Sequence, residues 1–103
     1  MRKYRVEITK VAESDIREIF EYISRANKAA AFKWVEEIER QIATLEIFPM
    51  RCPIIPEAEE LGEEYRHLSY GNYRTILKVE RTKVIIMRVI YSTRLLELEM
   101  FEK

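Results

Sequence analysis

The chain has little of the residue types that cross-link, interrupt or anchor proteins. Its 103 residues include one cysteine, two glycines and three prolines. A lone Cys52 cannot form an internal disulfide, and no apolar run approaches the roughly 20 residues of a membrane-spanning helix. The start MRKYRVEI lacks the apolar stretch of a secretion signal. These absences predict a soluble, cytoplasmic protein of one domain over residues 1–103, with no membrane contact.

Signatures of several enzyme classes are missing as well. The sequence contains no glycine-rich phosphate loop, no nucleophile elbow and no Cys/His cluster. Glu57, Glu59 and Glu60 lack metal-ligand spacing on any regular element. We therefore expect no metal and no cofactor, which argues against nucleotide hydrolases and metalloenzymes.

Charge is balanced overall but unevenly distributed along the chain. Residues 1–64 hold ten Lys/Arg against fourteen Asp/Glu, a balance of −4, whereas residues 65–96 hold seven against one, a balance of +6. Such segregation indicates a basic face for an acidic or polyanionic partner. Basic residues also discourage edge pairing of strands, so composition alone leaves both interpretations open.

The order of apolar residues predicts an α+β fold. Residues 4–9 read as a strand, and helical spacing follows from Thr9, a predicted N-cap, to Asn27 and again over about 28–48. These two helices should form an antiparallel hairpin. After a proline-containing loop at 49–56, strands at 65–70, 73–80 and 83–91 are separated by two-residue turns and form a three-stranded antiparallel sheet. The layout is β-α-α-β-β-β, with a short C-terminal helix from Ser92 or Thr93.

The two short turns also assign side chains to the two faces of the sheet. Because paired residues share a face and neighbours alternate, one face is continuously aliphatic and should receive the helices. The other face should expose an apolar patch with a polar rim, which usually marks a partner site. The patch is Ile76, Ile85, Met87 and Val89, and the rim is Arg74, Lys78, His67 and Tyr91.

Taken in order, DIREIFEYI, LEIFP, EYRHLSYGNYRTILKV and VIIMRVIYSTR resemble the RelE/ParE superfamily of bacterial toxins from type II toxin–antitoxin systems. The residues that carry the resemblance are Arg66, Leu68, Gly71, Tyr73, Arg74, Tyr91 and Arg94. The resemblance implies a RelE/ParE-like fold and a cognate antitoxin whose terminal segment wraps around the toxin. The apolar patch would bind that antitoxin. A homodimer and a hetero-oligomer with the antitoxin both stay open.

The superfamily has two functional branches. RelE-like members are ribosome-dependent endoribonucleases that cleave mRNA, whereas ParE-like members inhibit DNA gyrase. For the nuclease, Arg74 matches the phosphate-stabilising arginine, His67 could act as acid or base, and Tyr91 could donate a proton or stack on a base. Arg66, Lys78 and Arg94 are assigned to binding of the target or of phosphate.

Several usual nuclease positions are not matched. Tyr65 and His67 replace the paired lysines of the ribosomal nucleases, Ser92 replaces an arginine, and Leu98 replaces a tyrosine near the chain end. These departures favour the ParE-like branch, often linked to plasmid stabilisation. The sequence therefore predicts first a gyrase-directed toxin, second an endoribonuclease, and third a non-toxic interaction module.

Structural roles compete with the functional ones. Arg66 could pair with a carboxylate of the preceding loop, and Arg88 is expected in a structural ion pair. Trp34 and Phe32 are expected at the edge of the helical hairpin rather than in contact with a ligand.

Overall fold

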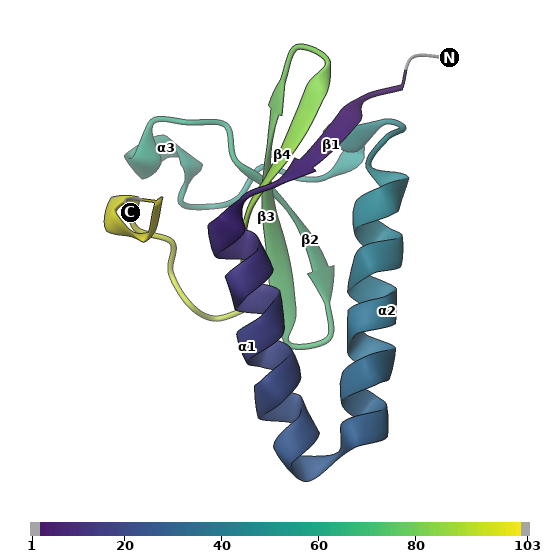
Figure 1. Cartoon of the computed structure of the whole chain (residues 1–103). Coiled ribbons are helices and arrows are strands. Elements are labelled where there is room, and N and C mark those ends of the chain that lie inside the picture. Colours follow the sequence, from purple (N-terminus) through teal and green to yellow (C-terminus); the bar gives the residue numbers. More distant parts are fainter. Residues whose placement is uncertain (1–2, 102–103) are drawn as a thin grey trace.

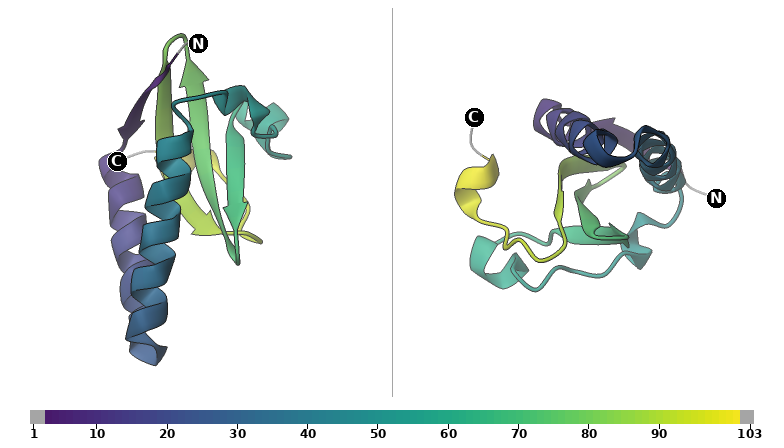
Figure 2. Two further views of the ribbon diagram at one scale, coloured as in Figure 1. Left: turned by 90° about the vertical axis from the view of Figure 1, so that its right-hand side faces the viewer. Right: turned by 90° about the horizontal axis from the view of Figure 1, so that it is seen from below.

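Four strands form one mixed sheet, with a helical hairpin on one face and less regular chain on the other (Figures 1 and 2). The computed structural model describes residues 3–101. The sheet order is β1-β4-β3-β2, with β1 parallel to β4 and the remaining pairs antiparallel. The helices and strands are β1 (Arg5–Ile8), α1 (Lys10–Ala26), α2 (Lys28–Thr44), α3 (Ala58–Leu61), β2 (Arg66–Tyr70), β3 (Tyr73–Glu80) and β4 (Lys83–Tyr91). The predicted α+β class is confirmed, and β1 adds a fourth strand to the expected three.

Asn27 makes the helical hairpin tight because it ends one helix and begins the next. Its backbone N–H donates to the Ile23 carbonyl at the end of α1, and its side chain accepts from the Ala30 N–H at the start of α2. Thr9 caps α1 in the same way, accepting from the Ala12 N–H at 3.1 Å. Substituting a side chain of this kind by alanine typically costs about 1 kcal/mol. Both helix starts therefore follow from local sequence.

The hairpin covers one face of the sheet and forms the larger core with it. Ile38, Ile42 and Leu45 pack against Leu77, Val84 and Ile86, and all six are buried. Trp34 is also buried in this core rather than at its edge, whereas Phe32 is exposed and packs on Phe20. The second helix ends at Thr44, earlier than the predicted Phe48.

A second, smaller core lies on the opposite face of the sheet. It joins Ile55 and Ala58, from the segment before β2, to Ile76 and Ile90 of the sheet and Leu96 near the C-terminus. Viewed from below, α3 and the C-terminal segment lie on the side of the sheet away from the hairpin (Figure 2). This face is therefore covered by the chain itself.

Two predicted segments differ from the structure. The predicted C-terminal helix is reduced to a 3₁₀ turn, Leu98–Phe101, at the end of an irregular strap over residues 92–101. Leu96, Met100 and Phe101 of this strap pack in the second core, whereas Leu95 is exposed, so the apolar residues form no single helical stripe. The predicted loop contains a 3₁₀ turn, Pro49–Arg51, which tolerates proline at its first position because the missing N–H has no partner there anyway. Within the described residues, no helix is long and apolar enough to cross a membrane.

A bulge in β4 changes the predicted faces of its second half. Both turns have the expected two residues, with Tyr70 opposite Tyr73 and Glu80 opposite Lys83. Between them, however, Ile76 pairs with Arg88 and Leu77 with Ile86, so that Met87 is an extra residue. Beyond the bulge, the side chains of β4 lie on the faces of the sheet opposite to those predicted. Val89 faces the hairpin and Ile90 the second core, opposite to the prediction.

Contacts from α1 hold this bulge in place. The Thr9 hydroxyl donates to the Met87 carbonyl at 3.1 Å. The Asp15 carboxylate accepts from the Val89 N–H at 3.0 Å and from two nitrogens of Arg88 at 2.7 and 2.9 Å. These bonds satisfy backbone groups that an unpaired residue would otherwise leave without partners. The expected structural ion pair of Arg88 is confirmed, with Asp15 as its partner.

Candidate functional site

Arg74 lies at the centre of a buried polar cluster on the face of the sheet opposite the hairpin. Its side chain is 5% exposed and makes a two-pronged ion pair with Glu57, which precedes α3 and is 10% exposed. The Arg74 Nη1 is 3.3 Å from Glu57 Oε1, and Nη2 bonds the other carboxylate oxygen. This geometry uses both edges of the guanidinium fork. The ion pair thus fixes the loop before β2 onto β3.

The same pair also holds the C-terminal segment. The Arg74 Nη2 donates to the Arg94 carbonyl at 2.8 Å, and the Leu96 N–H donates to Glu57 Oε2 at 2.9 Å. The Arg74 guanidinium and its hydrogen bonds hold the pKa of Glu57 at about 2 although burial opposes this. Glu57 is therefore ionised at neutral pH. We call Arg74, Glu57 and His67, with the Arg94 carbonyl and the Leu96 amide, the Arg74 cluster.

His67 completes the cluster from the neighbouring strand β2. Its Nδ1 is 3.4 Å from Arg74 Nη1, a distance at which a neutral imidazole nitrogen can accept a weak hydrogen bond. Burial first, and the Arg74 charge second, lower the pKa of His67 against the opposing effect of Glu57. The imidazole is accordingly neutral near pH 7. The structure brings two of the three residues of the predicted catalytic group together.

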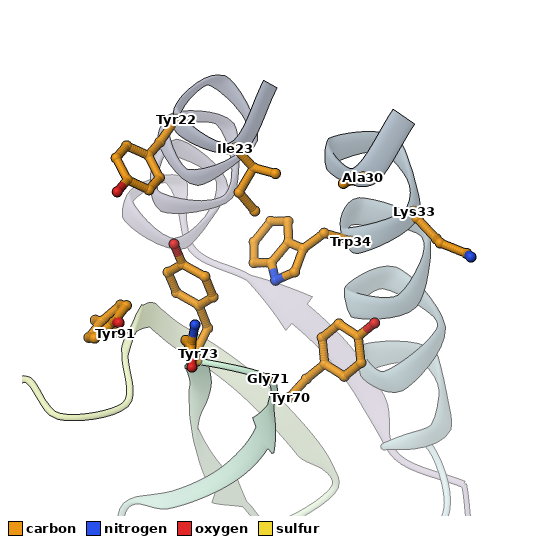
Figure 3. A pocket seen from close by; sticks show the side chains of 10 residues that line it. Tyr22, Ile23, Ala30, Lys33, Trp34, Tyr70, Gly71, Tyr73 and Tyr91 are labelled. Carbon is orange, nitrogen blue, oxygen red and sulfur yellow. The ribbon is translucent and has the colours of Figure 1, made fainter. Parts of the chain in front are cut away.

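The third, Tyr91, lies on the other face of the sheet. It pairs with Tyr73 across the strands, and the two rings meet edge to face at 5.5 Å. Tyr73 in turn meets Trp34 of α2 at 5.4 Å (Figure 3). The prediction that Tyr91 shares a face with Arg74 and His67 is wrong, because the bulge at Met87 inverts the end of β4.

The expected exposed patch is also wrong. Ile76 is 0% exposed in the second core, and Val89 is 2% exposed under the hairpin. Ile85 and Met87 are half-buried. The second face is covered because Tyr65 stacks on Phe101 of the C-terminal strap, with ring centroids 4.8 Å apart. The antitoxin-binding role of these four residues stays a prediction, and for Ile76 it would require that the chain covering the second face move.

Five of the seven basic residues in 65–96 lie near a carboxylate. Arg66 donates to the Met50 and Cys52 carbonyls at 3.2 and 2.7 Å, and Glu64 lies 3.6 Å from its Nη2. A carboxylate of the preceding segment thus pairs with Arg66 as predicted, although it is Glu64 rather than Glu57, Glu59 or Glu60. Of the seven basic residues in 65–96, those within 4 Å of a carboxylate are Arg66, Arg74, Lys78, Lys83 and Arg88.

Two site residues were not identified from the sequence. Glu57 stands in a run of glutamates with nothing local to distinguish it from Glu59 and Glu60, and Asp15 looks like an ordinary residue of a polar helix face. Only the tertiary fold brings them to Arg74 and Arg88. Within residues 3–101, no three histidine, cysteine, aspartate or glutamate side chains gather as a metal site would require.

Comparisons with known proteins agree with this architecture. The family model described as ParE toxin of type II toxin–antitoxin system, parDE, matches residues 6–96. A structure of the chromosomal ParDE system from P. aeruginosa has 18% identity and a TM-score of 0.67, covering 86% of this chain and 96% of that one. The RelBE2 toxin–antitoxin complex from Mycobacterium tuberculosis has 23% identity and a TM-score of 0.55, covering 88% and 93%. No similar sequence was found among curated proteins.

At these identities the solved structures establish the fold, while the family model spans nearly the whole length of the chain. The chain belongs to the ParE toxin family of type II toxin–antitoxin systems.

Proposed function

We propose that residues 1–103 form one cytoplasmic toxin domain that arrests growth by binding DNA gyrase and is neutralised by a cognate antitoxin. The observation that carries this choice of target is the state of Arg74. Its guanidinium is buried, paired with Glu57 and bonded to the Arg94 carbonyl. A nuclease of this superfamily would need that guanidinium free to contact a phosphate.

Electrostatics makes such a phosphate contact costly. Cleavage by the ribose 2′-OH concentrates negative charge on a crowded phosphorane, which cations must stabilise. To bind it, Arg74 would have to release Glu57, leaving a buried carboxylate without the counter-ion that lowers its pKa. Breaking a buried pair in this way typically costs about 3–5 kcal/mol. Arg74 would exchange the Glu57 carboxylate for the phosphorane, so the net stabilisation of the transition state would be small.

The endoribonuclease is the second candidate, and the composition of the Arg74 cluster favours it. The Arg74 guanidinium lies within hydrogen-bonding distance of both the Glu57 carboxylate and the neutral His67 imidazole, and these are groups that accept protons and stabilise phosphate. Two observations weigh against this candidate. Tyr91, the third predicted catalytic residue, lies on the other face of the sheet. The C-terminal strap would also have to leave, because Arg94 and Leu96 occupy bonds of the cluster.

Induction of the chain in bacteria, alone and with its cognate antitoxin, distinguishes these candidates. We expect growth arrest relieved by the antitoxin, inhibition of supercoiling by purified gyrase, and intact messages in primer extension. Codon-linked cuts without gyrase inhibition would establish the nuclease instead. Normal growth on induction, with folded protein present, would show a non-toxic interaction module.

Arg74→Lys and Arg88→Lys form a matched pair for the mechanism. Both arginines are ion-paired and largely buried, with side chains 5% and 12% exposed, but only Arg74 lies in the cluster. For a gyrase-directed toxin, both variants should keep inhibition in proportion to the folded fraction. Selective loss of toxicity in Arg74→Lys, with a folded fraction equal to that of Arg88→Lys, would contradict the proposal.

A further inference from the structure

A pocket of about 560 Å³ opens between the tip of the helical hairpin and the turn that joins β2 to β3 (Figure 3). α1 contributes Tyr22 and Ile23, and α2 contributes Ala30 and Trp34. The strands and turn contribute Tyr70, Gly71, Asn72, Tyr73 and Tyr91. Volumes of this size are typical of small-molecule sites. The pocket lies across the sheet from the Arg74 cluster, and we call it the tyrosine pocket.

Its aromatic rings are held in a fixed arrangement. Trp34 meets Tyr73 edge to face, and Tyr73 meets Tyr91 in the same way, which fixes the inner wall. At the mouth, Tyr22 is 65% exposed and Tyr91 48% exposed, so both keep free ring surface. Tyrosine and tryptophan faces of this kind stack on flat rings.

A buried hydrogen-bond donor in this wall lacks a partner. Trp34 is 6% exposed, and its Nε1 has no hydrogen-bond partner among the described residues. The indole N–H is a donor only, so what satisfies it must supply an acceptor. In Figure 3 this nitrogen points toward Tyr73 and the Gly71 turn, within the ring of lining side chains. Leaving such a donor unsatisfied is unfavourable, which favours an occupant with a carbonyl oxygen or ring nitrogen.

The charged groups around the pocket restrict the chemistry of the ligand further. No carboxylate lines the pocket, and the Lys33 ammonium points away from Trp34 (Figure 3). An ammonium or guanidinium ligand offers only donors and a purely aliphatic ligand offers no polar group, so both would leave the indole N–H unpaired. The remaining chemistry is a neutral flat ring with an acceptor on its edge.

We propose that the tyrosine pocket binds a nucleobase, stacked on tyrosine rings, with a base acceptor receiving the Trp34 N–H. The base can belong to a free nucleoside or to a single strand. This site is separate from the proposed toxin function, which depends on neither Trp34 nor Tyr73.

Trp34 is the only tryptophan in the chain, so its fluorescence reports occupancy directly. The purified full chain is titrated with uridine, a short oligouridylate and ribose 5-phosphate, which carries no base. Uridine and the oligonucleotide should change the fluorescence saturably with dissociation constants of about 1 mM or tighter, whereas ribose 5-phosphate should not. Equal affinity for both base-containing probes identifies the free base as sufficient. A much tighter oligonucleotide identifies a single strand.

Two variants test the hydrogen bond by calorimetry. Trp34→Phe keeps a ring but removes the donor and should weaken uridine binding about tenfold. Phe32→Leu, on the same helix but packed on Phe20 outside the pocket, should bind like the wild type. No saturable response to uridine or the oligonucleotide would overturn the proposal, as would unchanged uridine binding by folded Trp34→Phe. The cognate antitoxin is titrated as a further probe. If it alone changes the Trp34 fluorescence, the pocket binds a peptide and the nucleobase proposal is wrong.

Discussion

The ion pair between Glu57 and Arg74 makes a quantitative prediction for Glu57→Gln. The substitution keeps the shape of the side chain but removes its charge, weakening the bonds to Arg74 and to the Leu96 N–H. The pKa of Glu57 is lowered from 4.5 to about 2, and at about 1.36 kcal/mol per pKa unit this corresponds to roughly 3 kcal/mol. Removal of one partner from a buried pair gives a similar figure of about 3–5 kcal/mol. We expect Glu57→Gln to lower the free energy of unfolding by about 3 kcal/mol at pH 7.

The pH dependence gives the sharper test. A carboxylate whose pKa is depressed on folding contributes its full stabilisation above the unfolded value of 4.5 and loses it as pH falls toward the folded value of about 2. The gap in stability between wild type and Glu57→Gln should therefore be constant from pH 7 to about 5 and then narrow progressively as pH falls further. Urea unfolding at several pH values measures this gap. Amide exchange at Leu96 should also accelerate in the variant, because its acceptor is weakened.

Glu60→Gln is the matched control, since Glu60 belongs to the same short segment but is exposed. It should change stability by less than about 0.5 kcal/mol at every pH. Two results would refute the reasoning. One is a Glu57→Gln loss below about 1 kcal/mol, and the other is a gap that does not narrow between pH 5 and pH 3.

Three further predictions concern other parts of the fold. Asp15→Asn should lower the unfolding free energy by about 3 kcal/mol in urea melts, because Arg88 and the Val89 N–H lose a charged acceptor, while exposed Glu13→Gln should have little effect. Arg81→Gly should raise it by roughly 0.5 kcal/mol, because Arg81 has a φ of 55° that glycine adopts without strain, whereas Thr82→Gly should lower it. Burial raises the pKa of the Cys52 thiol against the effects of Arg51 and Arg66, so a thiol reagent should modify native protein at least about tenfold more slowly than protein in urea. An Asp15→Asn variant as stable as the wild type would contradict the first argument, and a destabilised Arg81→Gly variant the second. Equal rates of thiol modification in native and urea-unfolded protein would contradict the third.

Local features of the sequence were enough to predict most of the fold. Thr9 and Asn27 cap their helices with their own side chains. Each of the two short turns fixes the register of the two strands that it joins, over the residues next to the turn. The central arginine of the site was also predictable, because Arg74 lies in a recognisable G-x-Y-R strand. Each of these depends on residues close together in the chain.

The features that were missed depend on contacts between distant residues. The β4 bulge rests on Thr9 and Asp15, which are 78 and 73 positions from their partners Met87 and Arg88. Alternation of apolar residues cannot reveal such a shift, so Val89 and Ile90 were assigned to each other's faces. Two counter-ions of the basic segment were missed for the same reason, because Glu57 and Asp15 reach Arg74 and Arg88 only in the tertiary fold.

The bulge also bears on the choice between the two branches of toxin. In a regular register, with Met87 opposite Ile76 instead of bulged, alternation would place Tyr91 on the same face of the sheet as Arg74 and His67, assembling an acid, a base and a phosphate-binding cation there. In the bulged register Tyr91 instead pairs with Tyr73 on the other face, and Ile90 lies opposite Arg74. Arg74 is left among Glu57, His67 and the C-terminal strap, where it serves as an internal counter-ion. A one-residue change of register, held by Asp15 and Thr9, thus removes Tyr91, the predicted proton donor, from the face that carries Arg74, in line with our proposal of a toxin that acts by binding.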